Sequence, residues 1–443
     1  MKFRTTTWIL IGALAIVAGY FYLIEQRRND ANIRERLAGK KLFPYTREDV
    51  ERFVLINPKG ERTEVEHGAS DWKVVFPIEA PGDQPAIASF VDQVVPGRRG
   101  MEIVDAKSLD DYGLLRPFAT LIIYHRGAAA PDTLFVGDKT PTSSNSYVRL
   151  GGSTSVMISS VLTHNVMNRG LFHLRDKNFM PQGYESIDAV SIRSGRNTLR
   201  LKKVGSYWWF ETRHVRADRT KIASYLSRIT DAVIYEFVRE DAKELAPYGL
   251  EHPAQQLTLN KGAQATIISF GNRKDDLVYV LRTGLDKVIL LQGSLCEIFD
   301  WSAENLRAMN LSFFNRDSVE TIRYETPDTS AVLRIVGSKW GTASGDTLSI
   351  RSYQVDALLK KLDSKKFDKI LTEPFSGSDA RLSRFLVRVT LESASGLVLD
   401  RITLAPGDWT GEFGGSTSAN AIGSLGPGSA DELKAIFKRI IAR

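Results

Sequence analysis

The side chains that most often carry out catalysis are few in this chain and follow no catalytic or metal-binding pattern. Six histidines are spread along the sequence: His67, His125, His164, His173, His214 and His252. None of them stands in an arrangement such as His-Glu-x-x-His, in which two imidazoles share one helix face and bind zinc. We therefore predict neither a metal site nor a catalytic residue, and we expect no cofactor and a protein that is not an enzyme.

Two glycine-containing stretches resemble ligand-binding loops only superficially. Residues 136–140 (VGDKT) lack the first glycine and the Gly-Lys pair of a phosphate-binding loop. Residues 151–155 and 414–418 share the letters GGSTS, which we interpret as hairpin turns. Cys296, the only cysteine, stands beside Leu295 and Ile298, so we predict a buried apolar thiol and no intrachain disulfide. Because the sequence contains no phosphate-binding loop of the Walker type, any ATP-driven work must come from another chain.

A motif that occurs twice organises the sequence. Residues 112–117 (YGLLRP) return as 248–253 (YGLEHP), an offset of 248 − 112 = 136 residues, and Trp72 returns as Trp208 at the same offset. Landmarks in the same order at one offset indicate a structural unit written at least twice. We read the motif as a fold-setting turn, in which glycine permits a positive φ and proline fixes the entry into a strand. Its residues are Trp72, Tyr112, Gly113, Leu114 and Pro117, then Trp208, Tyr248, Gly249, Leu250 and Pro253.

Alternating and helical patterns fill each unit in the same way. In the first unit, strands are predicted at 52–57, 71–76, 119–125, 132–137, 146–151 and 155–159, with helices at 86–95 and 161–169. In the second, strands are predicted at 189–193, 198–203, 207–212, 256–259, 265–270, 277–282 and 287–291, with helices at 220–231 and from Ser294. Of the neighbours Trp208 and Trp209, one should be core, and the other could line a partner surface. A third unit, 314–443, lacks the turn motif.

The N-terminal region predicts attachment to a membrane. Residues 5–24 contain no charge, and twenty helical residues span about 30 Å, the thickness of the bilayer hydrocarbon. A cleaved signal peptide ending at Ala18 is the alternative. Gly12, Ala15 and Gly19 would form a small-residue face, at which another helix could approach closely, or would simply face lipid. Residues 25–45 predict a juxtamembrane helical stalk.

The charge balance excludes one class of partner. The formal net charge of +7 over 443 residues is modest and suits an anionic membrane surface. Lysines and arginines do not form a block interleaved with aromatic residues, so we expect no nucleic acid partner. Lys2 and Arg4 precede the apolar segment and four arginines follow it closely, a count that taken alone favours a cytoplasmic body.

As a set, these motifs resemble a bacterial family of unknown function that accompanies ABC transporters of the gliding-motility type. The first copy carries Trp72, Asp83, residues 112–117, Val136-Gly137, Tyr147-Val148 and residues 174–177 (LRDK). The second copy carries Trp208, Asp218, residues 248–253, Phe270-Gly271, Tyr279-Val280 and residues 306–309, where LRDK has become LRAM. The resemblance implies a periplasmic accessory subunit with its N-terminus in the cytoplasm, partnered by a permease and, through it, an ATPase.

These observations together predict an α+β fold. A single transmembrane helix at 5–24 and a stalk at 25–45 would precede two or three tandem repeats, each an antiparallel β-meander with flanking short helices, at 46–178, 179–313 and 314–443. The expected function is a non-catalytic subunit, anchored in the inner membrane, of an ABC-type transporter complex that guides an envelope substrate. The alternative is a stand-alone periplasmic protein that binds lipid or glycan or scaffolds the envelope.

Overall fold

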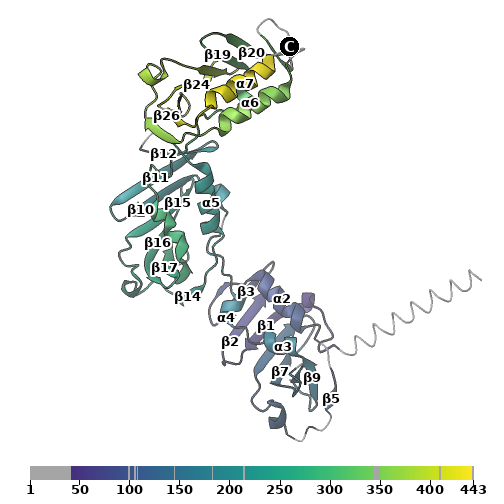
Figure 1. The fold of residues 1–443 in the computed structure, drawn as a ribbon. Helices are drawn as coiled ribbons and strands as arrows, with labels where there is room; N and C mark the ends of the chain where they lie inside the picture. The colour runs from purple at the N-terminus through teal and green to yellow at the C-terminus, as the bar shows by residue number, and fades with distance from the viewer. Residues whose placement is uncertain are drawn as a thin grey trace, which may run out of the picture. The chain divides into compact units, whose positions relative to one another are not determined.

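The computed structural model describes residues 41–97, 100–103, 106, 108–143, 145–181, 183–212, 215–342, 350–408 and 411–441. The chain divides into two compact units, residues 1–177 and 178–443 (Figure 1). The first unit contains one large antiparallel sheet, and the second contains two.

In the part of the chain that the structure describes, the first sheet has nine strands, in the order β4-β3-β2-β1-β6-β7-β8-β9-β5. Its strands are β1 (Val50–Ile56), β2 (Arg62–His67), β3 (Trp72–Phe76), β4 (Ala80–Pro81), β5 (Glu102–Ile103), β6 (Ala119–His125), β7 (Asp132–Lys139), β8 (Asn145–Leu150) and β9 (Val156–Ser160). Its helices are η1 (Arg47–Asp49), α2 (Gln84–Val94), η2 (Asp110–Tyr112), α3 (Val161–Val166) and α4 (Leu171–Leu174).

The second sheet follows the same order with nine strands, β13-β12-β11-β10-β15-β16-β17-β18-β14. Its strands are β10 (Ala189–Ser194), β11 (Asn197–Val204), β12 (Tyr207–Phe210), β13 (Arg216–Ala217), β14 (Glu236–Arg239), β15 (Gln255–Lys261), β16 (Gln264–Lys274), β17 (Leu277–Arg282) and β18 (Val288–Gln292). Its helices are η3 (Tyr184–Ser186), α5 (Arg219–Thr230), η4 (Ala246–Tyr248) and η5 (Gly293–Asp300).

The third sheet has eight strands among the described residues, in the order β21-β20-β19-β23-β24-β25-β26-β22. Its strands are β19 (Thr321–Glu325), β20 (Ser330–Val336), β21 (Lys339–Thr342), β22 (Lys369–Thr372), β23 (Val387–Glu392), β24 (Val398–Pro406), β25 (Glu412–Ser416) and β26 (Ala421–Leu425). Its helices are η6 (Arg316–Ser318), α6 (Ser352–Ser364), η7 (Ala380–Leu382) and α7 (Ser429–Ile441).

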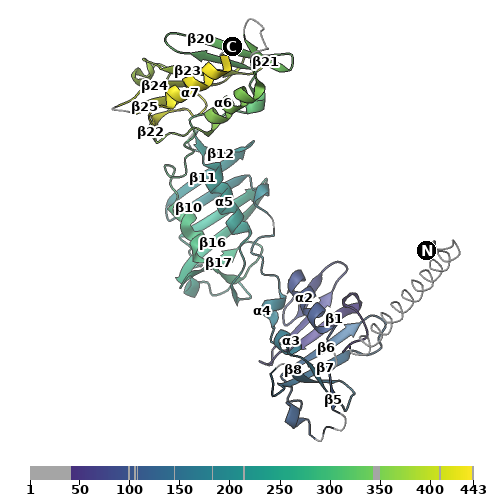
Figure 2. The same ribbon diagram turned by 45° about the vertical axis from the view of Figure 1, so that its right-hand side comes forward.

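One plan produces all three sheets. Three strands run as hairpins towards one edge, where the first two sheets add a short fourth strand, β4 or β13. A helix then crosses to a short strand at the opposite edge, β5, β14 or β22. Four more strands fill the space between, and the first of them pairs with the first strand of the sheet at the centre, as β6 pairs with β1. The crossing helices α2 and α5 each lie over one face of their sheet (Figure 2). Each begins at an aspartate, Asp83 or Asp218, whose carboxylate accepts hydrogen bonds from backbone N–H groups of the first turn.

The core of each sheet forms where the helix meets the strands. Helix α2 buries Ile87, Phe90, Val91 and Val94, which recur at helical spacing and therefore share one face. Phe90 stacks on Phe53 of β1 with ring centroids 4.9 Å apart. Helix α5 and the 13-residue helices α6 and α7 repeat this arrangement in the second unit, so each sheet has its own hydrophobic core.

The α+β prediction is wrong, because the described residues are mostly β: 40% lie in strands and 22% in helices, and the strands join into three large sheets rather than meanders. Strands such as β2 are predicted poorly from sequence. The helix expected at 161–169 is a six-residue helix, and the helix expected from Ser294 is a 3-10 helix.

Among the residues that the structure describes, no helix is both long and apolar enough to cross a bilayer. The transmembrane helix predicted at 5–24 lies outside those residues.

The end of the predicted stalk belongs to the first sheet. Leu42 and Phe43 are buried in its core together with Tyr45, and the Leu42 N–H donates to the Gly97 carbonyl oxygen at 2.6 Å. Residues 25–40 lie outside the described residues. The chain therefore enters the first sheet as a packed segment, at least from Leu42 onward.

Candidate functional site

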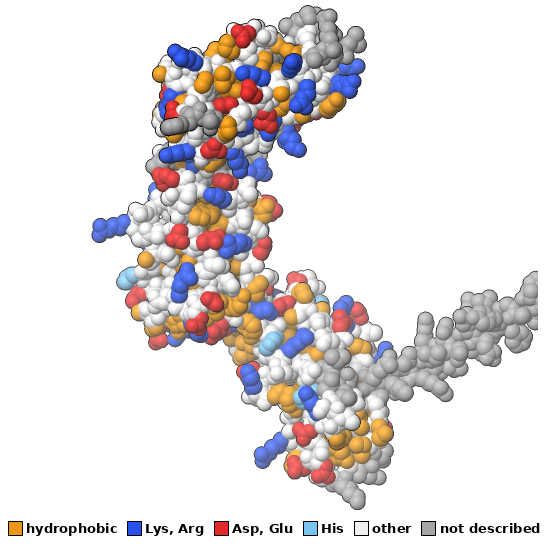
Figure 3. Space-filling model, in the orientation of Figure 1, with side chains coloured by type: hydrophobic (Ala, Val, Ile, Leu, Met, Phe, Trp, Pro, Cys, Tyr) orange, Lys and Arg blue, Asp and Glu red, His pale blue; other side chains and the backbone are white. Residues whose placement is uncertain are grey.

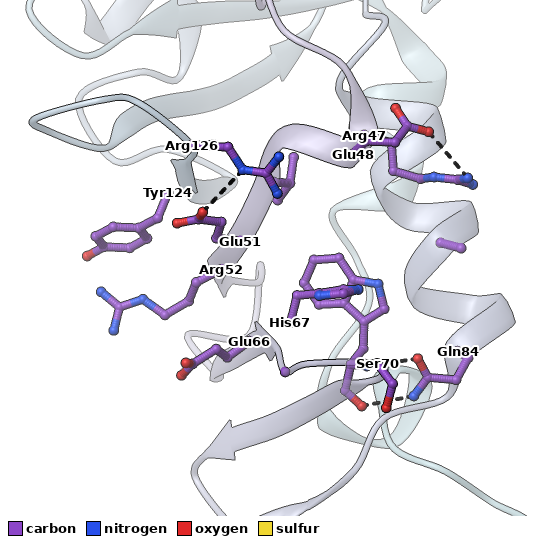
Figure 4. Close-up of a pocket in the computed structure, with 14 residues that line it drawn as sticks. Arg47, Glu48, Glu51, Arg52, Glu66, His67, Ser70, Gln84, Tyr124 and Arg126 are labelled. Carbon is purple, nitrogen blue, oxygen red and sulfur yellow. Dashed lines mark hydrogen bonds and ion pairs between the residues drawn. The ribbon is translucent and has the colours of Figure 1, made fainter.

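A pocket of about 920 Å³ lies in the first unit where β1 begins, β2 ends and α2 passes over the sheet (Figure 4). Arginines, glutamates and aromatic rings dominate its lining, which consists of Arg47, Glu48, Val50, Glu51, Arg52, Glu66, His67, Gly68, Ser70, Trp72, Gln84, Ala88, Tyr124 and Arg126. Three arginines and three glutamates come from η1, β1, β2 and the residue that follows β6, so the pocket is charged but balanced.

An irregularity in β1 exposes two of these charges side by side. The register between β1 and β6 shifts between Val50 and Arg52, so two residues on β1 oppose one on its partner. Val50 and Phe53 are buried, whereas Glu51 and Arg52 between them are not. In a regular strand, neighbouring side chains would face opposite sides of the sheet. The bulge thus lets Glu51 and Arg52 both line the pocket.

Tyr124, Arg52 and Glu66 form a row across three adjacent strands. Arg52 pairs in register with Tyr124 on β6 and with Glu66 on β2 (Figure 4). The guanidinium carbon of Arg52 lies 3.8 Å from the centroid of the Tyr124 ring, and its Nη1 lies 3.0 Å from the Glu64 carboxylate. Glu66 makes no ion pair among the described residues. A fixed cation and an unpaired carboxylate therefore lie side by side.

The other two arginines of the pocket make ion pairs that are more exposed than the Arg52–Glu64 pair. Arg126 Nε lies 3.8 Å from a Glu51 carboxylate oxygen, and both side chains are mostly exposed. Arg47 contacts Glu48 at 3.5 Å and Asp92 on α2 at 2.9 Å. Exposed pairs of this kind contribute about 0–1 kcal/mol each. They can open without a large cost to the fold.

The inner wall of the pocket is rigid. The Trp72 ring is buried and meets the His67 ring edge-on, with centroids 4.7 Å apart. The Gln84 side-chain amide donates to the Trp72 carbonyl oxygen at 2.9 Å, and the Trp72 N–H donates to the Gln84 side-chain oxygen at 2.8 Å. This reciprocal pair fixes the start of α2 against β3.

Of the motif residues predicted from sequence, only Trp72, which lies on β3, lines the pocket. The turn residues of the motif stabilise the fold instead. Gly113 ends η2 with φ 64°, and Gly249 ends η4 with φ 69°. Leu114 and Leu250 are buried behind these turns, and the rings of Tyr112 and Tyr248 contact Tyr147 and Tyr279. Pro117 and Pro253 lie two residues before β6 and β15.

Each glycine turn packs on a second glycine in the neighbouring strand. A Cβ atom on Gly137 would lie 2.2 Å from the Tyr112 carbonyl oxygen, and one on Gly271 would lie 2.1 Å from that of Tyr248. Side chains are therefore excluded at both strand positions. The third sheet has η7 in place of these turns, without a glycine cap, and Ala405 at the corresponding strand position.

The side chains of Trp208 and Trp209 differ in burial, as the alternation along a strand requires. Trp208 is buried in the core of the second sheet, in the strand that corresponds to that of Trp72. Trp209 lies 4.9 Å from the Arg216 guanidinium carbon, which also stacks on Phe313 at 4.4 Å. Trp209 thus takes part in the packing between the second sheet and the segment that leads to the third. The candidate helix-contact residues Gly12, Ala15 and Gly19 lie outside the described residues.

Neither the cysteine nor the histidines assemble a reactive site in the described part of the chain. Burial raises the pKa of the Cys296 thiol, which keeps it in its unreactive protonated form. Burial also lowers the pKa of His164, whose ring stacks on Phe118. No group of three or more His, Cys, Asp or Glu side chains there could hold a metal ion.

Sequence reasoning missed most of the pocket. Of its lining residues, Trp72 alone was singled out in advance as a motif residue. The signal that could have found the others is the pair Glu51-Arg52 directly before the apolar run 53–56 (FVLI), because two adjacent polar residues at a strand start are consistent with a bulge.

The chain matches one known protein family. A family model described as "Domain of unknown function (DUF4340)" matches residues 72–215 and again residues 208–384. The chain belongs to this family. No curated protein and no solved structure matches the chain. Each match begins at a strand tryptophan, Trp72 or Trp208, so the family model starts in one sheet and ends in the next.

Proposed function

We propose that this member of the DUF4340 family is a non-catalytic, membrane-attached subunit of a bacterial ABC-type transporter complex. In this role the apolar residues 5–24 hold the protein at the inner membrane, and residues 46–443 lie in the periplasm. The chain contacts a permease, which an ATPase subunit drives, and guides an envelope substrate. We further propose that this transporter is of the gliding-motility type.

The observation that carries the proposal is that one large antiparallel sheet occurs three times in a chain whose residues 5–24 are uncharged and of membrane-spanning length. Repeated units offer partners several equivalent surfaces, as in other repeat proteins that act by binding. The pocket of the first unit, with its balanced charges, fits binding of a polar group (Figure 4).

Surface charge is consistent with a role in binding proteins or lipid. In the face shown in Figure 3, acidic and basic side chains are interspersed and do not gather into a patch of one sign. A nucleic-acid partner would require a basic stripe.

Purification from native membranes tests the proposal. The full chain, tagged at its C-terminus, is solubilised in mild detergent, and the copurifying proteins are identified by mass spectrometry. We expect an ABC permease and its ATPase, both absent from a parallel preparation of an unrelated tagged single-pass protein. Recovery of neither would contradict the proposal and favour a stand-alone periplasmic protein that binds lipid or glycan or scaffolds the envelope.

A further inference from the structure

The row Tyr124–Arg52–Glu66 places a cation and an anion opposite each other on neighbouring strands. Residues directly opposite each other on neighbouring antiparallel strands have their Cβ atoms about 5 Å apart. Arg52 and Glu66 are such a pair, on β1 and β2. Arg52 nevertheless makes its ion pair with Glu64 instead, at 3.0 Å. Glu66 forms no ion pair among the described residues, not even with Lys73, which lies opposite it on β3.

Arg52 is oriented before any ligand arrives. Its guanidinium carbon lies 3.8 Å from the centroid of the Tyr124 ring, and its Nη1 forms an ion pair with Glu64 at 3.0 Å. A guanidinium presents its donors in a planar fork that matches two oxygens of a phosphate, and less side-chain freedom is lost on binding when the fork is already positioned. This end of the row suits a phosphate.

Glu66 provides the complementary end. An ionised carboxylate only accepts hydrogen bonds, so an unpaired glutamate beside a bound phosphate favours a ligand that brings its own cation with N–H donors. A primary ammonium meets this requirement. The neighbouring Arg126–Glu51 pair, at 3.8 Å and exposed, can open to admit the ligand at little cost.

We propose that this pocket binds phosphoethanolamine, with the phosphate on Arg52 and the ammonium on Glu66. In this ligand an ester oxygen and two carbon atoms separate the phosphorus from the ammonium nitrogen, a short spacing that a cross-strand pair can match. Its source is the headgroup of a membrane lipid, an inference that rests on the proposed membrane attachment. Residues 25–41 separate the apolar segment from the buried Leu42 and reach at most about 60 Å when fully extended. The first unit is thus tethered close to the bilayer surface.

Calorimetric titration tests the ligand chemistry. The full chain, held in nanodiscs of phosphatidylglycerol, whose headgroup lacks an ammonium, is titrated with soluble phosphoethanolamine and separately with inorganic phosphate. We expect Arg52→Gln to abolish binding of both. Glu66→Gln should weaken phosphoethanolamine about tenfold and leave phosphate unchanged. Arg149→Gln removes another arginine that stacks on an aromatic ring of the same sheet, Phe135, outside the pocket, and should change neither. Absence of phosphoethanolamine binding to the unmutated chain would overturn the proposal.

A second measurement distinguishes a lipid from a free ligand. Nanodiscs that contain phosphatidylethanolamine with a photoreactive headgroup should cross-link to peptides covering residues 50–67 in the unmutated chain and much less in Glu66→Gln. If soluble phosphoethanolamine binds in the titration but the lipid does not cross-link, the ligand is not a lipid headgroup. These experiments contain no transporter, so failure of the transporter proposal would leave their outcome unaffected.

Discussion

Asp400 carries a negative charge into the interior of the third sheet and is fully buried. Hydroxyl groups surround it: Ser312, Ser416, Thr417 and Ser418 all donate to its carboxylate, and the Ser418 backbone N–H donates as well. Ser312 belongs to the segment that joins the second sheet to the third. The buried carboxylate therefore ties this joining segment to the turn between β25 and β26.

We predict that Asp400→Ala destabilises the third sheet by about 3 kcal/mol, because several buried hydroxyls lose a charged acceptor at once. Urea unfolding of the full chain, followed by tryptophan fluorescence, measures the loss. Asp408→Ala is the matched control, since Asp408 is exposed in the turn after β24 and should matter little. Equal effects of the two substitutions would show that the hydroxyl network adds no stability.

His164 makes the stability of the first unit depend on pH. Burial, with Lys139 adding to it, lowers the pKa of this histidine in the folded chain below its ordinary value of 6.5. The unfolded chain therefore takes up a proton first as the pH falls, and stability is lost from about pH 6.5 downward. We expect the melting temperature to fall between pH 7 and pH 5, and His164→Gln to reduce that dependence. A His164→Gln variant with an unchanged pH profile would assign the effect to other groups.

At the scale of elements, the glycine turns depend on the strand that passes beneath them. Gly271 on β16 touches the carbonyl oxygen of Tyr248 so closely that a methyl group cannot fit. We predict that Gly271→Ala costs about 1–3 kcal/mol, since the turn must shift to admit the Cβ atom. Thermal unfolding monitored by circular dichroism measures the effect.

Gly205 provides the control for backbone freedom. It lies in the β11–β12 hairpin with φ 58°, and a Cβ atom there would meet nothing within 4 Å. Gly205→Ala therefore reports conformational strain alone, about 1 kcal/mol. If Gly271→Ala cost no more than Gly205→Ala, close packing of the turn would not be its role.

How much of each element could be predicted from sequence follows from its burial pattern. Residues 119–125 and 277–282 are strands at the bounds that alternation predicts, because buried and less buried side chains alternate along both. Strand β2 reads RTEVEH, and charged side chains outnumber its two buried residues, so no apolar pattern marks it. Glu66 lies on β2, and the pocket could not be predicted without that strand.

At the scale of the whole molecule, local sequence patterns do not predict the order of the strands in a sheet. The pairing of β1 with β6 joins strands separated in sequence by the crossing helix, and it turns two hairpin series into one nine-stranded sheet. The α+β prediction, with one antiparallel meander in each repeat, is wrong, because the described residues are mostly β and form three large antiparallel sheets in which strands distant in sequence pair. The repetition of Trp72 as Trp208 does predict the repeated architecture, since each lies in the third strand of its sheet and the two sheets have the same strand order.

The proposed transporter association depends on how residues 5–24 meet the permease. At helical spacing, Gly12, Ala15 and Gly19 fall on one face, where small side chains allow close approach of another helix. We predict that Ala15→Leu combined with Gly19→Leu lowers copurification of the permease severalfold and leaves membrane insertion, measured by carbonate extraction, intact. Ala13→Leu with Val17→Leu adds bulk on the opposite face of such a helix and should preserve copurification. If the first double variant also copurifies normally, contacts with the permease must come from the sheets of residues 46–443 instead.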